Sequence, residues 1–370
     1  MKLLRTLVSS LSPVGLLVLQ LSCGGGGGEP VGPGGHTASD ISANSSTTVP
    51  APPGSAVVEP PSVVVSDETG APMAGVLVTF AVTSGGGSVT GANATTNASG
   101  IATVGSWIIG SASTVNTLSA SAGTLAPVVF TGCATETDVL ESPVDAQLAV
   151  TDCPLADGSF TDFYTITIPT TGTYVFNQTS SVFDTYLVVF SATGTVIGVN
   201  DDFGDVGVQD SRVKAIMPAG TYIISANSFA AGKFGSYSLA SAASTTPVTN
   251  CEDAFVLPGI VSAQSLEAND CNTTPTTPST GFFYDDYVIF LSAGQSITVA
   301  MSSAALDSYV ELRPAGSGTV LASNDNIDAS TKDARFTFTI PNSAQATGFY
   351  IITAASPVAG VNGDYSFTVQ

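Results

Sequence analysis

Short runs in which apolar and polar residues alternate occupy most of the chain, and this pattern predicts β-strands. Residues Gly75–Val82 and Phe163–Ile168 alternate in this way, and Tyr186–Phe190 is an almost continuous apolar run. Clusters of turn-forming residues, such as Asn97–Gly100 and Pro218–Gly220, separate the runs. No long segment shows the helical period of three to four residues. The sequence therefore predicts an all-β protein of short strands, as in β-sandwiches.

The second part of the chain contains one series of short motifs twice, in residues 133–246 and again in residues 247–370. The matching motifs are Asp162-Phe163-Tyr164 and Asp285-Asp286-Tyr287, Asp184-Thr185-Tyr186 and Asp307-Ser308-Tyr309, Asn200-Asp201-Asp202 and Asn324-Asp325-Asn326, Gly220–Ile224 and Gly348–Ile352, and Gly235–Ser238 and Gly363–Ser366. The same order at a nearly constant offset indicates a tandem duplication. Aliphatic residues alternate with Tyr164, Tyr186, Tyr222 and Tyr237, which predicts that these tyrosines lie in the core. An exposed subset that contacts a polymer is the alternative.

Four of the five cysteines pair off by spacing. Cys133 and Cys153 are separated by nineteen residues, and so are Cys251 and Cys271. The equal spacing predicts one disulfide for each repeat and hence an oxidising compartment. A redox switch is the alternative, but a catalytic pair is usually closer in sequence, so we expect structural bridges.

The amino terminus has the features of an export signal. Lys2 and Arg5 precede an apolar stretch, Leu11–Leu21, that is too short to span a bilayer, and Cys23 follows it. This arrangement resembles a bacterial lipoprotein signal. The resemblance implies a signal peptide over residues 1–22, lipid on Cys23, and a bacterial cell-envelope lipoprotein anchored to the outer membrane. An ordinary secretory signal is the alternative.

A Gly-rich tether is expected over residues 23–36, and a first folded module over residues 37–132. This module contains about seven predicted short strands, an Asn97-Ala98-Ser99-Gly100 turn and a Gly105-Ser106-Trp107 strand. It resembles the bacterial Ig-like domains of the invasin/intimin type, which implies a spacer or adhesive stalk. Trp107 lies between β-branched neighbours and is expected in the sandwich core.

The two repeats resemble the bacterial pre-peptidase C-terminal domain in their Asp-x-Tyr, Asp-[Thr/Ser]-Tyr, Asn-Asp-[Asp/Asn] and Gly-x-Tyr motifs. That family has a jelly-roll-like β-sandwich and is appended to secreted peptidases and other surface proteins. The expected architecture is therefore three tandem β-sandwich domains, one Ig-like and two jelly-roll-like, with the repeats at 133–246 and 247–370.

The chain is strongly acidic, with a net charge of −21. Nucleic acid and anionic membrane surfaces would be repelled, so neither is an expected partner. Each repeat holds twelve acidic and three basic residues. Solubility alone would explain the excess of acids, but it would not explain why the acids recur at matching positions.

Some of these acids are candidate calcium ligands, because calcium binds six to eight oxygens. The candidates in the first repeat are Asp184, Asn200, Asp201, Asp202 and Asp205, and the weaker set in the second repeat is Asp307, Asn324 and Asp325. Some members of the resembled family bind calcium. Asx turns that cap the local backbone are the alternative, and the spacing is not that of a recognised calcium loop.

No catalytic residues are predicted. The single histidine, His36, falls in the expected tether, and the paired cysteines are used in bridges. A pair of carboxylates could support glycoside hydrolysis, but no cleft is marked. We therefore expect a non-catalytic surface protein that binds or displays extracellular polysaccharide, matrix or another surface component. A purely structural stalk, or an accessory subunit of a secreted hydrolase, is the alternative.

Overall fold

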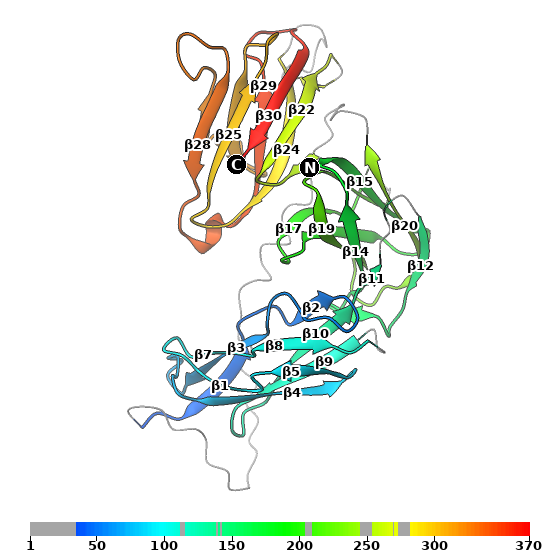
Figure 1. Ribbon diagram of the computed structural model, residues 1–370, viewed down its shortest axis with the longest axis vertical. Coiled ribbons are helices and arrows are strands. Elements are labelled where there is room, and N and C mark those ends of the chain that lie inside the picture. Colours follow the sequence, from blue (N-terminus) through cyan, green and yellow to red (C-terminus); the bar gives the residue numbers. More distant parts are fainter. Residues whose placement is uncertain are drawn as a thin grey trace.

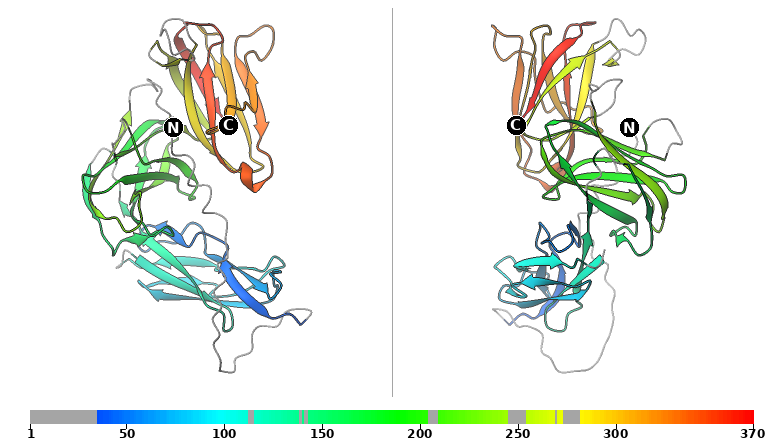
Figure 2. Two further views of the ribbon diagram at one scale, coloured as in Figure 1. Left: turned by 180° about the vertical axis from the view of Figure 1, so that it is seen from behind. Right: turned by 45° about the vertical axis from the view of Figure 1, so that its right-hand side comes forward.

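The computed structural model describes residues 35–111, 115–137, 140, 143–203, 209–244, 254–268, 270–272 and 282–370. Three β-sandwiches follow one another along the long axis of the molecule (Figures 1 and 2). One short 3₁₀ turn, η1 (Ala344–Ala346), is the only helical element in these ranges. No helix there is long and apolar enough to cross a membrane. The predicted all-β fold of tandem sandwiches is confirmed.

The N-terminal module contains a three-stranded sheet, a five-stranded sheet and a two-stranded ribbon. The three-stranded sheet has the order β1 (Ala38–Ala43), β3 (Ser62–Asp67) and β7 (Ile101–Thr103). The five-stranded sheet has the order β2 (Thr48–Ala51), β10 (Val128–Ala134), β9 (Val115–Ser121), β4 (Leu77–Ser84) and β6 (Asn93–Thr95). The ribbon pairs β5 (Gly87–Thr90) with β8 (Ser106–Ile109). Trp107 is fully buried in the core between them, as predicted. A side chain at Gly132 would meet the Trp107 ring at 2.8 Å, so the glycine makes room for the indole.

The structure corrects the placement of His36 in the tether. His36 Nδ1 lies 2.8 Å from Glu68 Oε1 and 3.5 Å from Asp67 Oδ2, at the edge of the N-terminal module. The backbone N–H of Thr37 also donates to Glu68. The folded module therefore begins before residue 37, because these contacts hold the preceding residue against the loop after β3.

The first repeat packs two sheets face to face. One sheet contains β11 (Glu136–Thr137), β14 (Phe160–Ile168), β19 (Gly220–Ser228), β16 (Thr185–Ser191) and β17 (Val196–Asn200), with β13 (Cys153–Pro154) beside β14. The other contains β12 (Val144–Leu148), β20 (Gly235–Ser244), β15 (Gly172–Thr179) and β18 (Ser211–Met217). The apolar residues at alternate positions of each strand fill the space between the sheets.

The second repeat has the same plan. Its first sheet contains β24 (Phe283–Leu291), β29 (Gly348–Ala355), β26 (Tyr309–Pro314) and β27 (Ala322–Asn324), with β23 (Cys271–Asn272) beside β24. Its second sheet contains β22 (Ile260–Leu266), β30 (Gly363–Val369), β25 (Ser296–Ser302) and β28 (Ala334–Thr339).

A short strand joins the two repeats into one continuous sheet. Strand β21 (Ala254–Val256) pairs in parallel with β18 of the first repeat and with β24 of the second. Its central residue, Phe255, enters the core cluster of the first repeat and meets Phe349 of the second edge-to-face. A Cβ at Gly198 would lie 2.7 Å from the Phe255 ring, so only glycine leaves room for this contact. The junction therefore fixes one repeat against the other.

The Asp-x-Tyr motif of each repeat forms a hydrogen-bonded cluster between the sheets. In the second repeat, Tyr365 donates to Asp285 at 2.6 Å, and the Tyr287 and Tyr365 hydroxyls are 2.5 Å apart. In the first repeat, Tyr237 donates to Asp162 at 2.7 Å and lies 2.5 Å from the Tyr164 hydroxyl. The same cluster occurs in both copies, because one strand supplies the Asp and a Tyr, and the facing sheet supplies the other Tyr.

The backbone conformation explains why a glycine lies two residues before the last tyrosine of each cluster. Gly235 and Gly363 have φ values of 150° and 156°, which L side chains rarely adopt. A Cβ at these positions would also approach Val182 at 2.7 Å and Ala305 at 3.2 Å. The Gly-x-Tyr motif thus starts β20 and β30 and places the tyrosine in the core.

The predicted Cys133–Cys153 disulfide is present, with the Cα atoms 5.9 Å apart. Cys133 lies in β10, so the expected domain boundary before it falls inside a strand of the N-terminal module. The bridge therefore joins the N-terminal module to the first repeat. Cys271 is also disulfide-bonded. Its predicted partner, Cys251, lies outside the described residues, so that pairing stays a prediction.

Candidate functional site

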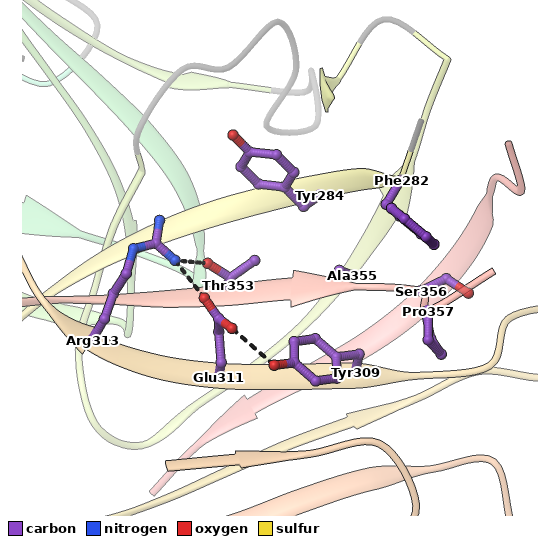
Figure 3. Close-up of a pocket in the computed structure, with 9 residues that line it drawn as sticks. All are labelled: Phe282, Tyr284, Tyr309, Glu311, Arg313, Thr353, Ala355, Ser356 and Pro357. Atoms are coloured by element: carbon purple, nitrogen blue, oxygen red, sulfur yellow. Dashed lines mark hydrogen bonds and ion pairs between the residues drawn. The ribbon is translucent and has the colours of Figure 1, made fainter. Parts of the chain in front are cut away.

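A pocket of about 450 Å³ lies on the outer face of the second repeat, over β24, β26 and β29 (Figure 3). Its lining consists of Phe282, Tyr284, Tyr309, Glu311, Arg313, Thr353, Ala355, Ser356 and Pro357. Strand alternation explains this face: in β24, Asp285 and Tyr287 point into the core, so Tyr284 and Asp286 point outward. The volume falls within the range of small-molecule sites.

Three aromatic side chains form the walls of the pocket. Tyr284 comes from β24, Tyr309 from β26, and Phe282 stands just before β24 with 40% of its side chain exposed. Figure 3 shows Tyr284 and Tyr309 on opposite sides of the space, with Phe282 at one end. The pocket therefore offers ring surface on several sides of whatever enters it.

A polar network of Arg313, Glu311 and Thr353 forms part of the lining, and Asp286 joins this network from just outside the lining. Arg313 is 2.9 Å from Glu311 and 2.6 Å from Asp286, and it also donates to Thr353. Tyr309 donates to the other oxygen of Glu311 at 2.9 Å. The three charged side chains are only 15–19% exposed, so the network is held in place and partly screened from water.

Burial alters the titration of this network. It raises the pKa of Asp286, although the hydrogen bond from Thr353 and the charge of Arg313 act in the opposite direction. Burial, reinforced by Glu311, also raises the pKa of Tyr309. Tyr309 therefore stays protonated and remains a donor to Glu311 at neutral pH.

The first repeat has a different surface at the same positions. Strand registers make Phe163 equivalent to Asp286, Val188 to Glu311 and Phe190 to Arg313. In the first repeat, Phe163 packs with the Cys133–Cys153 bridge, and Phe190 lies against that cluster. The duplication therefore keeps an apolar, covered face in one copy and has a charged, open face in the other.

The predicted calcium ligands of the first repeat are only partly grouped. Asp184 has a buried Oδ1 without a hydrogen-bond partner, and burial followed by the charges of Asp202 and Asp201 raises its pKa to about 6. Asn200 instead closes the loop: its Oδ1 accepts from the Arg212 backbone N–H, and its Nδ2 donates to the Asp202 carbonyl. Asp205 lies outside the described residues. Among the described residues, Asp184, Asp201 and Asp202 do not bring three ligand oxygens within 4.8 Å of one another. The asparagine fits the turn alternative, and calcium stays a prediction.

The second repeat shows the same division of roles. Asp307 has an equivalent buried Oδ1 without a partner, and its Oδ2 is 3.9 Å from the Lys332 ammonium. Asn324 accepts from the Arg335 backbone and donates to the Asn326 carbonyl, while Asp325 is exposed. Within the described ranges, the group of three metal-ligating side chains with donor atoms within 4.8 Å of one another is His36, Asp67 and Glu68.

Sequence reasoning did not find the pocket. Glu311, Arg313 and Tyr284 lie outside the motifs that the two repeats share, so a comparison of those motifs does not identify them. The available signal was the difference between copies, because Asp286 and Arg313 replace phenylalanines in a duplicated strand pattern. A charged residue at a position that is apolar in the other copy marks a face whose surroundings have changed.

Comparisons with known proteins give low similarity. No protein-family model matches the sequence, and no curated protein matches it. A pre-peptidase C-terminal domain of a Bacillus anthracis collagenase covers 34% of this chain and 99% of its own, at 12% identity and a TM-score of 0.23. Invasin, a bacterial integrin-binding protein, matches at 17% identity and a TM-score of 0.21, over 90% of this chain and 56% of its own.

A carbohydrate-binding module of a β-sandwich superfamily matches at 9% identity and a TM-score of 0.17, over 89% of this chain and 94% of its own. Similarities at this level carry no argument about ligand or activity. The β-sandwich architecture rests on the sheets described above.

Proposed function

We propose that this protein is a non-catalytic cell-surface lipoprotein that binds an extracellular polymer or surface component through the pocket of its second repeat. The observation that carries the proposal is the pocket of the second repeat, whose charged network stands where the first repeat has the apolar residues Phe163, Val188 and Phe190. Aromatic rings beside a few fixed polar groups are the usual composition of a binding site. Lipid on Cys23 would hold the chain at the bacterial outer membrane.

The arrangement of the carboxylates supports binding over catalysis. Asp286 and Glu311 both pair with Arg313, so one guanidinium engages both acids of the site. A glycoside hydrolase needs one carboxyl as a proton donor and a second free to act as nucleophile or base. His36, the single histidine of the chain, lies in the N-terminal module and belongs to a different sandwich.

One observation favours the structural alternative. Strand β21 and Phe255 lock the two repeats together, which suits a rigid stalk that displays something else. The stalk and the binder differ in whether the pocket of the second repeat has an occupant.

The test is a binding array of bacterial, plant and host glycans together with matrix proteins. The chain without its signal segment would be compared with Tyr284→Ala, and with Phe234→Ala, which removes an exposed aromatic ring of the first repeat. Binding that Tyr284→Ala abolishes and Phe234→Ala retains supports the proposal. Binding by none of the three proteins would assign the chain to the structural alternative, and equal binding by all would place the ligand outside the pocket and overturn the proposed site.

A further inference from the structure

The hydrogen-bonding capacity left in the pocket indicates the kind of group that it can hold. Arg313 has five N–H donors, of which three are used by Glu311, Thr353 and Asp286. Glu311 accepts one hydrogen bond at each oxygen, from Arg313 and from Tyr309, and each oxygen keeps a further lone pair. Donors and acceptors therefore lie side by side, and a ligand hydroxyl, which both donates and accepts, satisfies both.

The charges of the pocket disfavour ionic ligands. Glu311 and Arg313 line the pocket, and Asp286, just outside the lining, adds a second acid to the same base, within a chain of net charge −21. An anionic ligand would meet this negative excess. A cationic ligand that reached Glu311 would lie beside the guanidinium, which is 2.9 Å from that carboxylate. Both signs of charge are thus opposed at the Glu311–Arg313 pair.

The aromatic walls complete the description of the ligand. Tyr284 and Tyr309 lie on opposite sides of the space, Phe282 stands at one end, and Arg313 stands at the other (Figure 3). An occupant must therefore present flat apolar surface to the rings and hydroxyls to the network. A pyranose ring has C–H groups on its faces and hydroxyls around its rim. The volume of about 450 Å³ accommodates a short stretch of such rings, and the open side lets a longer chain continue outward.

We propose that the pocket binds a neutral saccharide, with sugar faces on Tyr284 and Tyr309 and hydroxyls on the Glu311–Arg313 pair. This inference rests on the proposed binding function and narrows it to one ligand class. A peptide partner fits less well, because the pocket offers no free charge for a peptide terminus or side chain.

The experiment is isothermal titration of the chain with hexasaccharides that differ in charge. N-acetylglucosamine hexamer, cellohexaose and xylohexaose are the neutral probes, glucosamine hexamer is the cationic probe, and galacturonic acid hexamer is the anionic probe. A collagen-like peptide serves as the protein probe. The variants are Tyr284→Ala, Glu311→Gln and Phe282→Ala, and the matched control is Phe234→Ala. Phe282 and Phe234 are 40% and 48% exposed, so neither truncation disturbs a core.

The expected result is binding of at least one neutral hexamer that is weakened about tenfold or more by Tyr284→Ala and by Phe282→Ala, and is unchanged by Phe234→Ala. Glu311→Gln should weaken the same binding, because it frees Arg313 from one partner and removes a strong acceptor. Pocket-dependent binding of a charged hexamer or of the peptide would overturn the saccharide class but leave the binding function standing. Binding of no probe by any protein would overturn both.

Discussion

The buried Asp285 should make the second repeat less stable as the pH rises. Asp285 is 3% exposed, and burial raises the pKa of its carboxyl to about 8, with the Tyr365 hydrogen bond acting in the opposite direction. In the unfolded chain the same carboxyl titrates near its ordinary value of 3.8. Between these values the native state holds one proton more than the unfolded state. The stabilising contribution is therefore complete below about pH 4 and lost as the pH rises to about 8.

The size of the effect follows from this window. One proton difference lowers the free energy of unfolding by about 1.4 kcal/mol per pH unit. Between about pH 5 and pH 7.5 this amounts to about 3 kcal/mol for Asp285 alone. Asp285→Asn removes the titration and keeps an acceptor for the Tyr365 hydroxyl. The free energy of unfolding of the variant should therefore increase steadily relative to that of the wild type as the pH rises over that range.

Calorimetric unfolding across this pH range measures the difference. Trp107, the only tryptophan, lies in the N-terminal module, so its fluorescence reports that module separately from the tyrosine signals of the repeats. Asp364→Asn removes an exposed acid beside Tyr365 and is the matched control. Parallel pH profiles for wild type and Asp285→Asn would refute the reasoning, and so would an equal change in Asp364→Asn.

Three other predictions concern the junction, the candidate cation and the anchor. Gly198→Val places side-chain atoms against the Phe255 ring, so overpacking should cost about 1–3 kcal/mol and separate the calorimetric transitions of the two repeats; one unchanged transition would contradict it. Calcium at about ten times its dissociation constant should raise the free energy of unfolding of the first repeat by about 1.4 kcal/mol through Asp184. The melting temperature should therefore rise, a chelator should reverse the rise, and Asp201→Asn should abolish it. An unchanged melting temperature would leave the acids as turn formers. Cys23→Ala should abolish fatty-acid labelling and release the protein to the soluble fraction, whereas an unlabelled, soluble wild type would indicate an ordinary secretory signal.

Periodicity and turn chemistry were enough to predict the fold class, because every sandwich strand buries alternate residues. Trp107, Tyr164, Tyr222 and Tyr237 were predicted as core and are buried. The same prediction was wrong for Tyr186, which is half-buried on the outer face of β16 because its neighbour Leu187 is the residue that points into the core. The sequence could not show that β21 enters the sheet of the preceding repeat, because three residues carry no periodic signal. It could not show that Cys133 belongs to β10 either, because spacing alone does not distinguish a strand's end from the start of the next module.

The pocket escaped prediction for a related reason. An outward-facing strand residue is free to be polar, so Glu311 and Arg313 look like ordinary surface in a linear pattern. Only the fold places them beside Tyr284, which is supplied by a different strand far away in sequence. Ligand sites on sheet faces depend on which strands are neighbours, and the alternation of a single strand does not contain that information.

The most direct test of the binding site is a crystal structure of the chain soaked in turn with the three neutral hexasaccharides. The account predicts sugar density between Tyr284 and Tyr309, with hydroxyls in hydrogen-bond contact with Glu311 and Arg313. It also predicts none on the equivalent face of the first repeat, where Phe163 and Phe190 pack toward the disulfide. An empty pocket in every soak, or sugar bound on the first repeat instead, would contradict it.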